Sequence, residues 1–336
     1  MQVVILAGGL GKRLRPLTLT RPKALVPLVD KPQVVHILES LPPSCGEAIL
    51  AVNYRFQQVR DYFREHEFPM KVRVVDEPTP LGTGGALRNL EDLLHGPFAV
   101  YNGDVVDSID FDDLLRTHRK GHGIGTIALW PVEDPSAFGA VEVAADRITR
   151  FVEKPTPGET ESRLVNAGRY VFEPEVFDFI AKGTAVSLER EVIPHLIDRG
   201  LTAFRFEGWW SDAGTLSNYL NAQHLLLAAG HGKIAPDAAV TSGTLRPPVA
   251  IGAGSFVEGR LGPDVVLGRS CKVGRALIQN ATLLDGVSID DKAEVVRSIL
   301  GSGAAVGEGA QIRDSILQDG VQIPPHAEVV DGRVAA

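Results

Sequence analysis

The chain has 336 residues, of which 44% are apolar and 23% charged, as in an ordinary globular protein of more than one domain. Its net charge of −8 excludes general nucleic-acid binding, because no basic excess is available to neutralise phosphates. The two cysteines, Cys45 and Cys271, are far apart in the sequence and are expected to remain reduced. No signal peptide or membrane-spanning run is visible, so we expect a cytoplasmic protein that does not bind membranes.

The first thirty-two residues carry the strongest local pattern. Residues 3–6 form a short apolar run that predicts a buried β-strand. Glycines and cations follow it: Gly8, Gly9, Gly11, Lys12, Arg13, Arg15 and Lys23. Glycines let backbone N–H groups approach a phosphate, and fixed cations supply the counter-charge. A tight turn without a ligand and solvated surface cations are the structural alternatives, and we favour a polyphosphate-binding loop.

Apolar strands then alternate with helical stretches up to about residue 104. We predict strands at 47–52, 71–76 and 98–101 and helices at 33–41, 54–66 and 84–94. Such alternation favours an α/β domain with a Rossmann-like, mostly parallel sheet. Because ligands of these sheets bind beyond the carboxyl ends of the strands, the glycine loop and Asn102-Gly103-Asp104 are expected to face one crevice.

The next section, up to about residue 230, is less regular. It predicts shorter, antiparallel strands at 125–130, 139–143, 148–151 and 169–172, and helices at 187–199 and 216–229. The pair Trp209-Trp210 lies between these two helices and is interpreted as packing residues that position Asp212, not as a sugar-stacking platform.

Beyond residue 232 apolar residues recur at every sixth position. The four triplets are Leu261, Leu267, Val273; Leu283, Ile289, Val295; Leu300, Val306, Ile312; and Leu317, Ile323, Val329. A helical period of 3.6 does not fit, whereas each triplet fits one coil of a three-sided parallel β-helix. We therefore predict two domains, residues 1–232 and 233–336.

Taken together, these motifs resemble the sugar-nucleotide pyrophosphorylase family, and among its members the mannose-1-phosphate guanylyltransferases. The resemblance includes Leu6-Ala7-Gly8-Gly9, the motif 81–85, Asn102-Gly103-Asp104, Phe138-Gly139, 151–155, Asn166-Ala167-Gly168, and Trp210 with Asp212 and Gly214. A hexapeptide-repeat tail folded as a left-handed β-helix is also a family feature. Lys12 departs from the threonine that the family more often has.

The resemblance implies an enzyme that transfers a nucleotidyl group from a nucleoside triphosphate to a sugar 1-phosphate and releases pyrophosphate. GTP and mannose 1-phosphate are the favoured substrates, giving GDP-mannose. Positioning and charge neutralisation supply catalysis of this kind. Arg13 is then expected to stabilise the β- and γ-phosphates and Lys23 the α-phosphate, while Arg15 has no role in the chemistry.

The other expected contacts follow from the same resemblance. Nucleotide-binding residues are Leu6, Ala7, Gly8, Gly9, Gly11, Gly82, Thr83 and Asn102, and sugar-phosphate-binding residues are Gly139, Glu153, Lys154 and Asn166. Asp104 and Asp212 are the candidate Mg²⁺ ligands, because this ion prefers one or two carboxylates together with substrate phosphates. A helix-entry loop at 81–85 and a charged strand exit at Glu153-Lys154 are the structural alternatives.

Two other functions remain open. One is a thymidylyl-, uridylyl- or cytidylyltransferase acting on glucose 1-phosphate or a related sugar. The other is a non-catalytic, nucleotide-sugar-sensing subunit, although Arg13, Lys23, Asp104 and Asp212 are all in place. A homo-oligomer assembled through the β-helix is expected, because its faces and open end offer surfaces for subunit contacts.

Overall fold

The structure, a computed structural model, describes all residues from 1 to 336. It divides into two compact units. The first comprises Met1–Gly9 and His36–Trp210, and the second comprises Leu10–Val35 and Ser211–Ala336. The chain therefore leaves the first unit directly after the strand at its N-terminus, and the segment with most of the early cations belongs to the second unit.

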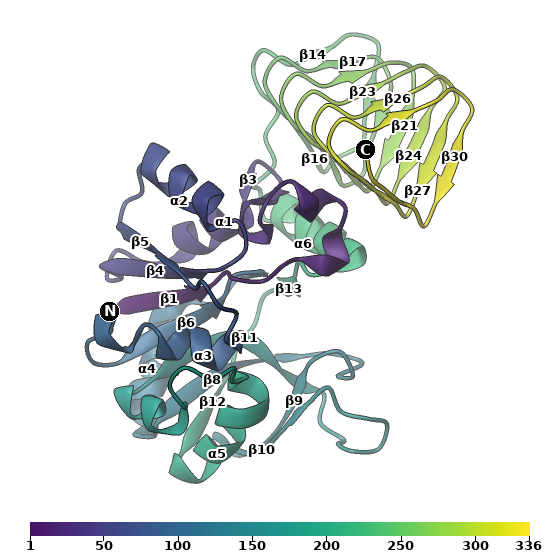
Figure 1. Ribbon diagram of the computed structural model, residues 1–336. Helices are drawn as coiled ribbons and strands as arrows, with labels where there is room; N and C mark the ends of the chain where they lie inside the picture. Colours follow the sequence, from purple (N-terminus) through teal and green to yellow (C-terminus); the bar gives the residue numbers. More distant parts are fainter. The chain divides into compact units, whose positions relative to one another are not determined.

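The first unit is built on a nine-stranded sheet (Figure 1). Its order is β5 (Lys71–Asp76), β4 (Glu47–Val52), β1 (Gln2–Leu6), β6 (Phe98–Asn102), β11 (Leu164–Phe172), β8 (Gly125–Pro131), β12 (Leu201–Arg205), β10 (Arg147–Glu153) and β9 (Gly139–Ala144). The expected parallel pairing holds from β5 to β6 and recurs between β12 and β8. Strand β11 is antiparallel to its neighbours, as β10 is to its own, so the α/β sheet is mixed.

The strand predictions agree with the structure closely in the parallel half, where β4 and β5 have the predicted bounds. The strand predicted at 169–172 is wrong in length, because β11 begins at Leu164. Its pairing with β8 shifts register between Asn166 and Tyr170, and this irregularity hides the strand from a search for alternating apolar residues. Strand β12 was not predicted.

The helices are α1 (Gln33–Ser40), α2 (Phe56–Glu65), α3 (Gly82–Arg88), α4 (Phe111–Gly121), α5 (Ile193–Leu196) and α6 (Leu216–Ala228). The helix predicted at 84–94 ends at Arg88 and is followed by a 3-10 turn, Glu91–Leu93. The helix predicted at 187–199 is a π turn (Leu188–Val192), then α5, then a 3-10 turn (Ile197–Arg199). Pro194 lies within it and has no N–H to donate, which explains the irregular hydrogen bonding.

Short elements complete the chain. They are the two-residue strands β2 (Pro27–Leu28) and β3 (Lys31–Pro32), the strands β7 (Val105–Asp107) and β13 (Trp210–Asp212), and the 3-10 turns Lys12–Leu14, Leu17–Leu19, Lys23–Leu25 and Pro174–Phe179.

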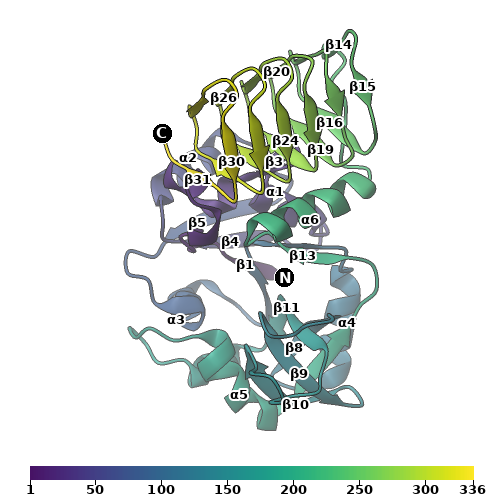
Figure 2. The ribbon, with the colours of Figure 1, turned by 90° about the vertical axis from the view of Figure 1, so that its right-hand side faces the viewer.

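The second unit contains the predicted β-helix, formed by three six-stranded parallel sheets (Figure 2). The first sheet is β14 (Ala239–Val240), β17 (Phe256–Val257), β20 (Lys272–Val273), β23 (Ser288–Ile289), β26 (Ala305–Val306) and β29 (Gln322–Ile323). The second is β15 (Thr244–Leu245), β18 (Arg260–Leu261), β21 (Leu277–Gln279), β24 (Glu294–Val296), β27 (Gln311–Arg313) and β30 (Glu328–Val330). The third is β16 (Val249–Ile251), β19 (Val265–Leu267), β22 (Ala281–Leu283), β25 (Ile299–Leu300), β28 (Ile316–Leu317) and β31 (Arg333–Val334).

The six-residue period correctly identified the interior of this β-helix. Eleven of the twelve predicted inward residues are buried, and Val329 in the last coil is partly buried against them. Equivalent residues stack from coil to coil, as Leu283, Leu300 and Leu317 do in the third sheet. Burying one apolar side chain per face in every coil makes a continuous core.

Helix α6 packs alongside this β-helix within the second unit (Figure 2). The amide of Gln223, which is fully buried, donates to the carbonyl of Asp264 at 2.9 Å and accepts from the hydroxyl of Thr282. The hydroxyl of Tyr219 donates to the carbonyl of Pro27. The β-helix, α6 and the segment Leu10–Val35 are therefore joined by buried polar contacts.

Both cysteines are free and buried. Burial raises the pKa of the Cys45 and Cys271 thiols to about 11, so both remain protonated at neutral pH. The prediction of two reduced thiols is confirmed. No helix of the structure combines the length and the apolar character needed to cross a membrane.

Candidate active site

The carboxyl ends of β1 and β6 lie side by side in the first unit. The two strands are parallel neighbours, with Leu6 opposite Asn102, and the N–H of Gly103 donates to the carbonyl of Leu6 at 3.0 Å. A Cβ atom at position 103 would lie 2.8 Å from that carbonyl oxygen, so only glycine fits there. The expected proximity of the glycine loop to Asn102-Gly103-Asp104 is confirmed for Leu6 and Ala7.

A buried carboxylate lies beside the start of the glycine loop. Glu77 is buried and accepts a hydrogen bond from the N–H of Leu81 at 2.8 Å. Its Oε2 atom would be 3.2 Å from a Cβ at Gly8. Burial raises the pKa of Glu77 more than the bond from Leu81 lowers it. Glu77 belongs to a motif of the family resemblance but was not predicted as a site residue, although its place directly after β5 was a usable signal.

Asn102 is the last residue of β6, and one polar atom of its side chain has no hydrogen-bond partner in the protein. Its Oδ1 atom is buried and accepts no hydrogen bond. A Cβ at Gly168 would lie 2.7 Å from its Nδ2 atom, and Gly168 has φ of +72°. A buried carbonyl oxygen without a donor is costly, and its position at the end of β6 suits a ligand that brings a donor.

Arg169 was not predicted as a site residue, yet it fixes the loop that holds Asp104. Its side chain is 2% exposed and donates to the carbonyls of Asn102 at 2.9 Å and Val105 at 2.7 Å, which flank Gly103 and Asp104. Its guanidinium forms an ion pair with Asp107 at 2.8 Å and lies 4.2 Å from the centre of the Tyr101 ring. The signal in the sequence that could have revealed Arg169 is an arginine among the apolar residues of a strand.

The two other aspartates near Asp104 have the local roles expected of them. Asp107 accepts from the N–H of Ile109 at 3.0 Å, as in a turn. Asp110 is the N-cap of α4 and accepts from the N–H groups of Asp112 and Asp113. These contacts explain both residues without a ligand.

Gly82 and Thr83 begin α3 and contact the segment 186–189. Gly82 has φ of +72°, and a Cβ there would lie 2.6 Å from the carbonyl oxygen of Val186. The hydroxyl of Thr83 donates to Glu189 at 2.7 Å and accepts from the N–H of Leu188 at 2.9 Å. The structure thus gives the Thr83 side chain a local role, while the exposed backbone of Gly82 remains accessible.

The residues predicted for the sugar phosphate lie on β9, β10 and β11. Gly139 pairs with Glu153, and a Cβ at position 139 would lie 2.4 Å from the ring of Phe151 and 3.0 Å from Oε2 of Glu153. Lys154 follows β10 and is exposed, with its ammonium 4.0 Å from Glu153. On β11 the amide of Asn166 donates to the hydroxyl of Tyr170 and accepts from the N–H of Gly168.

Glu153→Gln is expected to raise the melting temperature at neutral pH. Burial, followed by the charge of Glu189, raises the pKa of Glu153 above its ordinary 4.5, and Lys154 and Arg190 offset this only in part. A carboxyl whose pKa is higher in the folded state costs stability once the pH exceeds the unfolded value. The gain should therefore be present at pH 7 and absent at pH 4 in thermal unfolding.

Glu159→Gln is the matched control for this prediction. Hydrogen bonds from the N–H and hydroxyl of Thr156 lower the pKa of Glu159, so this substitution should lower the melting temperature at pH 7. A lower melting temperature for Glu153→Gln at pH 7 would contradict the inference that the ionised Glu153 side chain destabilises the folded protein.

The remaining predicted residues, Gly11, Arg13, Lys23 and Asp212, belong to the second unit. Gly11 has φ of +60°, and a Cβ there would lie 2.8 Å from the side chain of Thr18 and 3.2 Å from that of Lys23. The Thr18 hydroxyl donates to the carbonyl of Gly11 at 2.9 Å. Lys23 is only 9% exposed, which is unusual for lysine. Gly11 and Lys23 therefore lie close together across a compact turn.

Arg13 and Asp212 lie close together over Gly214. A Cβ at Gly214 would be 2.5 Å from Nη2 of Arg13 and 3.2 Å from Oδ2 of Asp212. Oδ1 of Asp212 accepts from the side-chain amide of Asn218, at the start of α6. Arg13 is exposed, as are Lys12 and Arg15. Because Gly214 has no side chain, Arg13 and Asp212 can both approach its backbone in the second unit.

The carboxylates of Asp104, in the first unit, and Asp212, in the second unit, are oxygen donors of the type that a hard divalent cation prefers. The structure contains no group of three or more His, Cys, Asp or Glu side chains arranged to hold a metal ion. Within the second unit Arg13 lies beside Asp212, so a cation and a carboxylate are close together there.

Comparison with known proteins identifies the class. The nucleotidyl transferase family matches residues 2–229, and the GMPPB C-terminal domain family matches residues 234–335. The structure of a "Putative Glucose-1-Phosphate Thymidylyltransferase" from Bacillus anthracis, in complex with a sucrose, superimposes with a TM-score of 0.61 at 25% identity, covering 67% of this chain and 94% of that one. The structure of HddC from Yersinia pseudotuberculosis, complexed with GMP-PN, gives 0.57 at 26% identity, covering 66% and 97%. The chain belongs to the nucleotidyl transferase family.

Relatives that match most of the chain indicate a particular group within this family. The mannose-1-phosphate guanyltransferase of Neurospora crassa is 35% identical over 334 residues, covering 93% of this chain and 89% of its own. That of Schizosaccharomyces pombe is 35% identical over 332 residues, covering 91% and 87%. The mannose-1-phosphate guanylyltransferase catalytic subunit beta of Dictyostelium discoideum is 37% identical over 255 residues, covering 70% of each. The resemblance inferred from the motifs is confirmed.

Proposed function

We propose that this protein transfers GMP from GTP to mannose 1-phosphate, giving GDP-mannose and pyrophosphate. The observation that carries the proposal is the end-to-end similarity, at 35% identity, to relatives named for this reaction. Such similarity includes both the catalytic fold and the C-terminal β-helix, so it is stronger support than a glycine-rich loop alone.

In the proposed reaction a phosphate oxygen of mannose 1-phosphate attacks the α-phosphorus of GTP. The bond between the α-phosphorus and the bridging oxygen breaks, and pyrophosphate leaves with the electron pair. The backbone N–H groups of Gly8, Gly9 and Gly11 would bind the triphosphate. Arg13 would neutralise charge on the leaving pyrophosphate, and Lys23 would bind the α-phosphate, where its burial strengthens the attraction.

The other contacts complete the proposal. Leu6, Ala7, Gly82, Thr83 and Asn102 would bind the nucleoside, Asn102 through its unpartnered Oδ1. Gly139, Glu153, Lys154 and Asn166 would bind the sugar phosphate. Asp104 and Asp212 would hold Mg²⁺, which neutralises phosphate charge when bound.

A matrix of substrates tests the proposal and its alternatives. GTP, ATP, UTP, CTP and dTTP are each combined with mannose 1-phosphate and glucose 1-phosphate, and pyrophosphate release is measured with Mg²⁺. We expect GTP with mannose 1-phosphate to have the highest kcat/KM, by about a hundredfold over the other bases, because polar contacts to a base edge discriminate strongly. Faster release from dTTP or UTP with glucose 1-phosphate would favour the second candidate, which the Bacillus anthracis structure supports. No release from any pair would favour a non-catalytic, nucleotide-sugar-sensing subunit.

We also propose that catalysis resides in residues 1–232 and that residues 233–336 mediate assembly of a homo-oligomer. The end of α6 at Ala228 and the start of β14 at Ala239 support this boundary. A monomeric mass in light scattering at micromolar concentration would refute the oligomer. A cytoplasmic location is proposed from the two reduced cysteines.

A further inference from the structure

One carboxylate of the β-helix contacts the segment that carries Gly11, Arg13 and Lys23. Asp319 accepts from Arg21 at 2.6 and 2.7 Å and from the hydroxyl of Thr20 at 2.7 Å. It also accepts from the N–H of Ser302, one coil earlier, at 2.7 Å. Thr20 and Arg21 immediately precede Pro22 and Lys23, so the contact fixes the chain two residues before Lys23.

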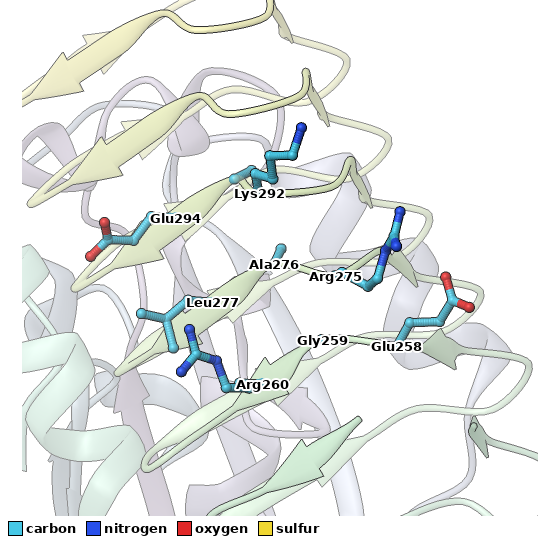
Figure 3. Close-up of a pocket in the computed structure, with 9 residues that line it drawn as sticks. Glu258, Gly259, Arg260, Arg275, Ala276, Leu277, Lys292 and Glu294 are labelled. Carbon is cyan, nitrogen blue, oxygen red and sulfur yellow. The ribbon is translucent and has the colours of Figure 1, made fainter. Parts of the chain in front are cut away.

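This contact differs from the other ion pairs of the β-helix. Most of those join neighbouring coils on the exposed surface, as at the shallow groove of about 270 Å³ that Arg275, Lys292 and Glu294 help to line (Figure 3). Arg275 pairs with Asp291 and Lys292 with Glu308, and both cations are 75% exposed. Arg21 and Asp319 are only 19% and 24% exposed. Exposed pairs contribute little, whereas a sheltered, charge-assisted pair fixes geometry.

The state of Asp319 agrees with a fixed ion pair. Partial burial raises its pKa, but the hydrogen bonds from Arg21 and Thr20 and the charge of Arg21 outweigh that effect, so the pKa lies below its ordinary value. Asp319 is therefore ionised throughout the neutral range.

Packing within residues 11–23 connects Thr20 and Arg21 to the residues proposed to bind phosphate. Thr18 packs against Gly11 and hydrogen-bonds to its carbonyl, and Gly11 in turn lies against Lys23. Leu14 and Leu17 are fully buried in the same segment. A shift at Thr20 and Arg21 would therefore displace both Gly11 and Lys23, and small displacements of positioned groups lower rates strongly.

We propose that Asp319 is a positioning residue: from the β-helix, it sets the conformation of residues 11–23 for the triphosphate. The inference rests on the proposed function, because it assumes that Gly11 and Lys23 bind a nucleoside triphosphate. The β-helix would then contribute to nucleotide binding as well as to subunit assembly.

The chain contains a matched control for Asp319. Because Leu283, Leu300 and Leu317 stack in register, Asp285 occupies the position equivalent to Asp319 two coils earlier. Asp285 accepts from the N–H of Arg269 at 2.8 Å, and its ion-pair partner is the exposed Arg269. Replacing either aspartate by asparagine keeps an oxygen for the backbone N–H, and only Asp319→Asn removes the charge that faces Arg21.

The experiment compares full-length wild type, Asp319→Asn and Asp285→Asn. We expect Asp319→Asn to raise the KM for GTP about tenfold and to leave the KM for mannose 1-phosphate unchanged, whereas Asp285→Asn stays within about twofold of wild type. Amide hydrogen exchange in residues 11–25 should be faster in Asp319→Asn alone. Arg21→Gln combined with Asp319→Asn should be no worse than either single change, as for groups that act through one contact.

The outcomes separate this inference from the proposed function. Equal KM values for GTP in Asp319→Asn and Asp285→Asn, with an active wild type, would overturn the positioning role alone, as would unchanged hydrogen exchange. A wild type that neither turns over GTP nor binds it in calorimetry with Mg²⁺ would overturn the proposed function, and with it the role given to Asp319.

Discussion

Asp104→Asn is expected to lower the rate of pyrophosphate release by about a hundredfold or more while the protein stays folded. Asp104 follows β6, beside the end of β1, and its loop is fixed by the bond from Gly103 to Leu6. Asparagine keeps the shape of the side chain but removes the charge that a hard cation requires. The variant should also need more Mg²⁺ for half-maximal activity, which a metal titration at saturating substrates measures.

Asp110→Asn is the control for this substitution. Asp110 caps α4, and asparagine caps helices about as well as aspartate does. It should therefore retain both the activity and the melting temperature of the wild type. Near-normal activity of Asp104→Asn, or an unchanged Mg²⁺ requirement, would remove Asp104 from the proposed metal site.

Arg169→Met is expected to destabilise the protein by about 3–5 kcal/mol, the usual cost of leaving one partner of a buried ion pair alone. The change leaves Asp107 without its cation and the carbonyls of Asn102 and Val105 without a donor. Denaturant unfolding followed by tryptophan fluorescence measures the loss. Activity should fall as well, because these carbonyls flank Asp104.

Two further variants make this second prediction specific. Arg150 forms an exposed pair with Glu142, so Arg150→Met should cost less than about 1 kcal/mol. Adding Asp107→Asn to Arg169→Met should recover part of the lost stability, because the buried charge is then gone. Equal costs for Arg169→Met and Arg150→Met would show that the buried network is not what stabilises the loop.

The sequence was most informative where one physical effect dominates. Strand β4 and the interior of the β-helix were predicted closely because apolar burial alone specifies them. The early part of β11 was missed because Asn166 and Gly168 interrupt its apolar pattern. Its pairing with β8 also shifts register between Asn166 and Tyr170, and a search for a period of two does not detect such an irregularity.

The candidate site was predictable only in part for a similar reason. Glycines followed by cations, and an aspartate after a strand, are local signals that selected Gly8, Arg13 and Asp104 as candidates. Arg169 and Asp319 act through carbonyls and side chains that only the fold brings to them. Nothing in the residues around Asp319 indicates that its partner is Arg21, because the pairing depends on how the last coils pack against the second unit's N-terminal segment.

The pairing of Thr20 and Arg21 with a carboxylate 299 and 298 residues later has a consequence for synthesis of the protein. Residues 10–35 leave the ribosome among the first, yet their anchor at Asp319 is translated close to the end. A nascent chain can pair β1 with β4 and β6 early, since these strands are complete by residue 102. The segment that contains Lys23 can make this contact only when almost the whole chain has been synthesised. In a polypeptide released prematurely, these strands could pair while the segment proposed to bind phosphate lacks its contact with Asp319.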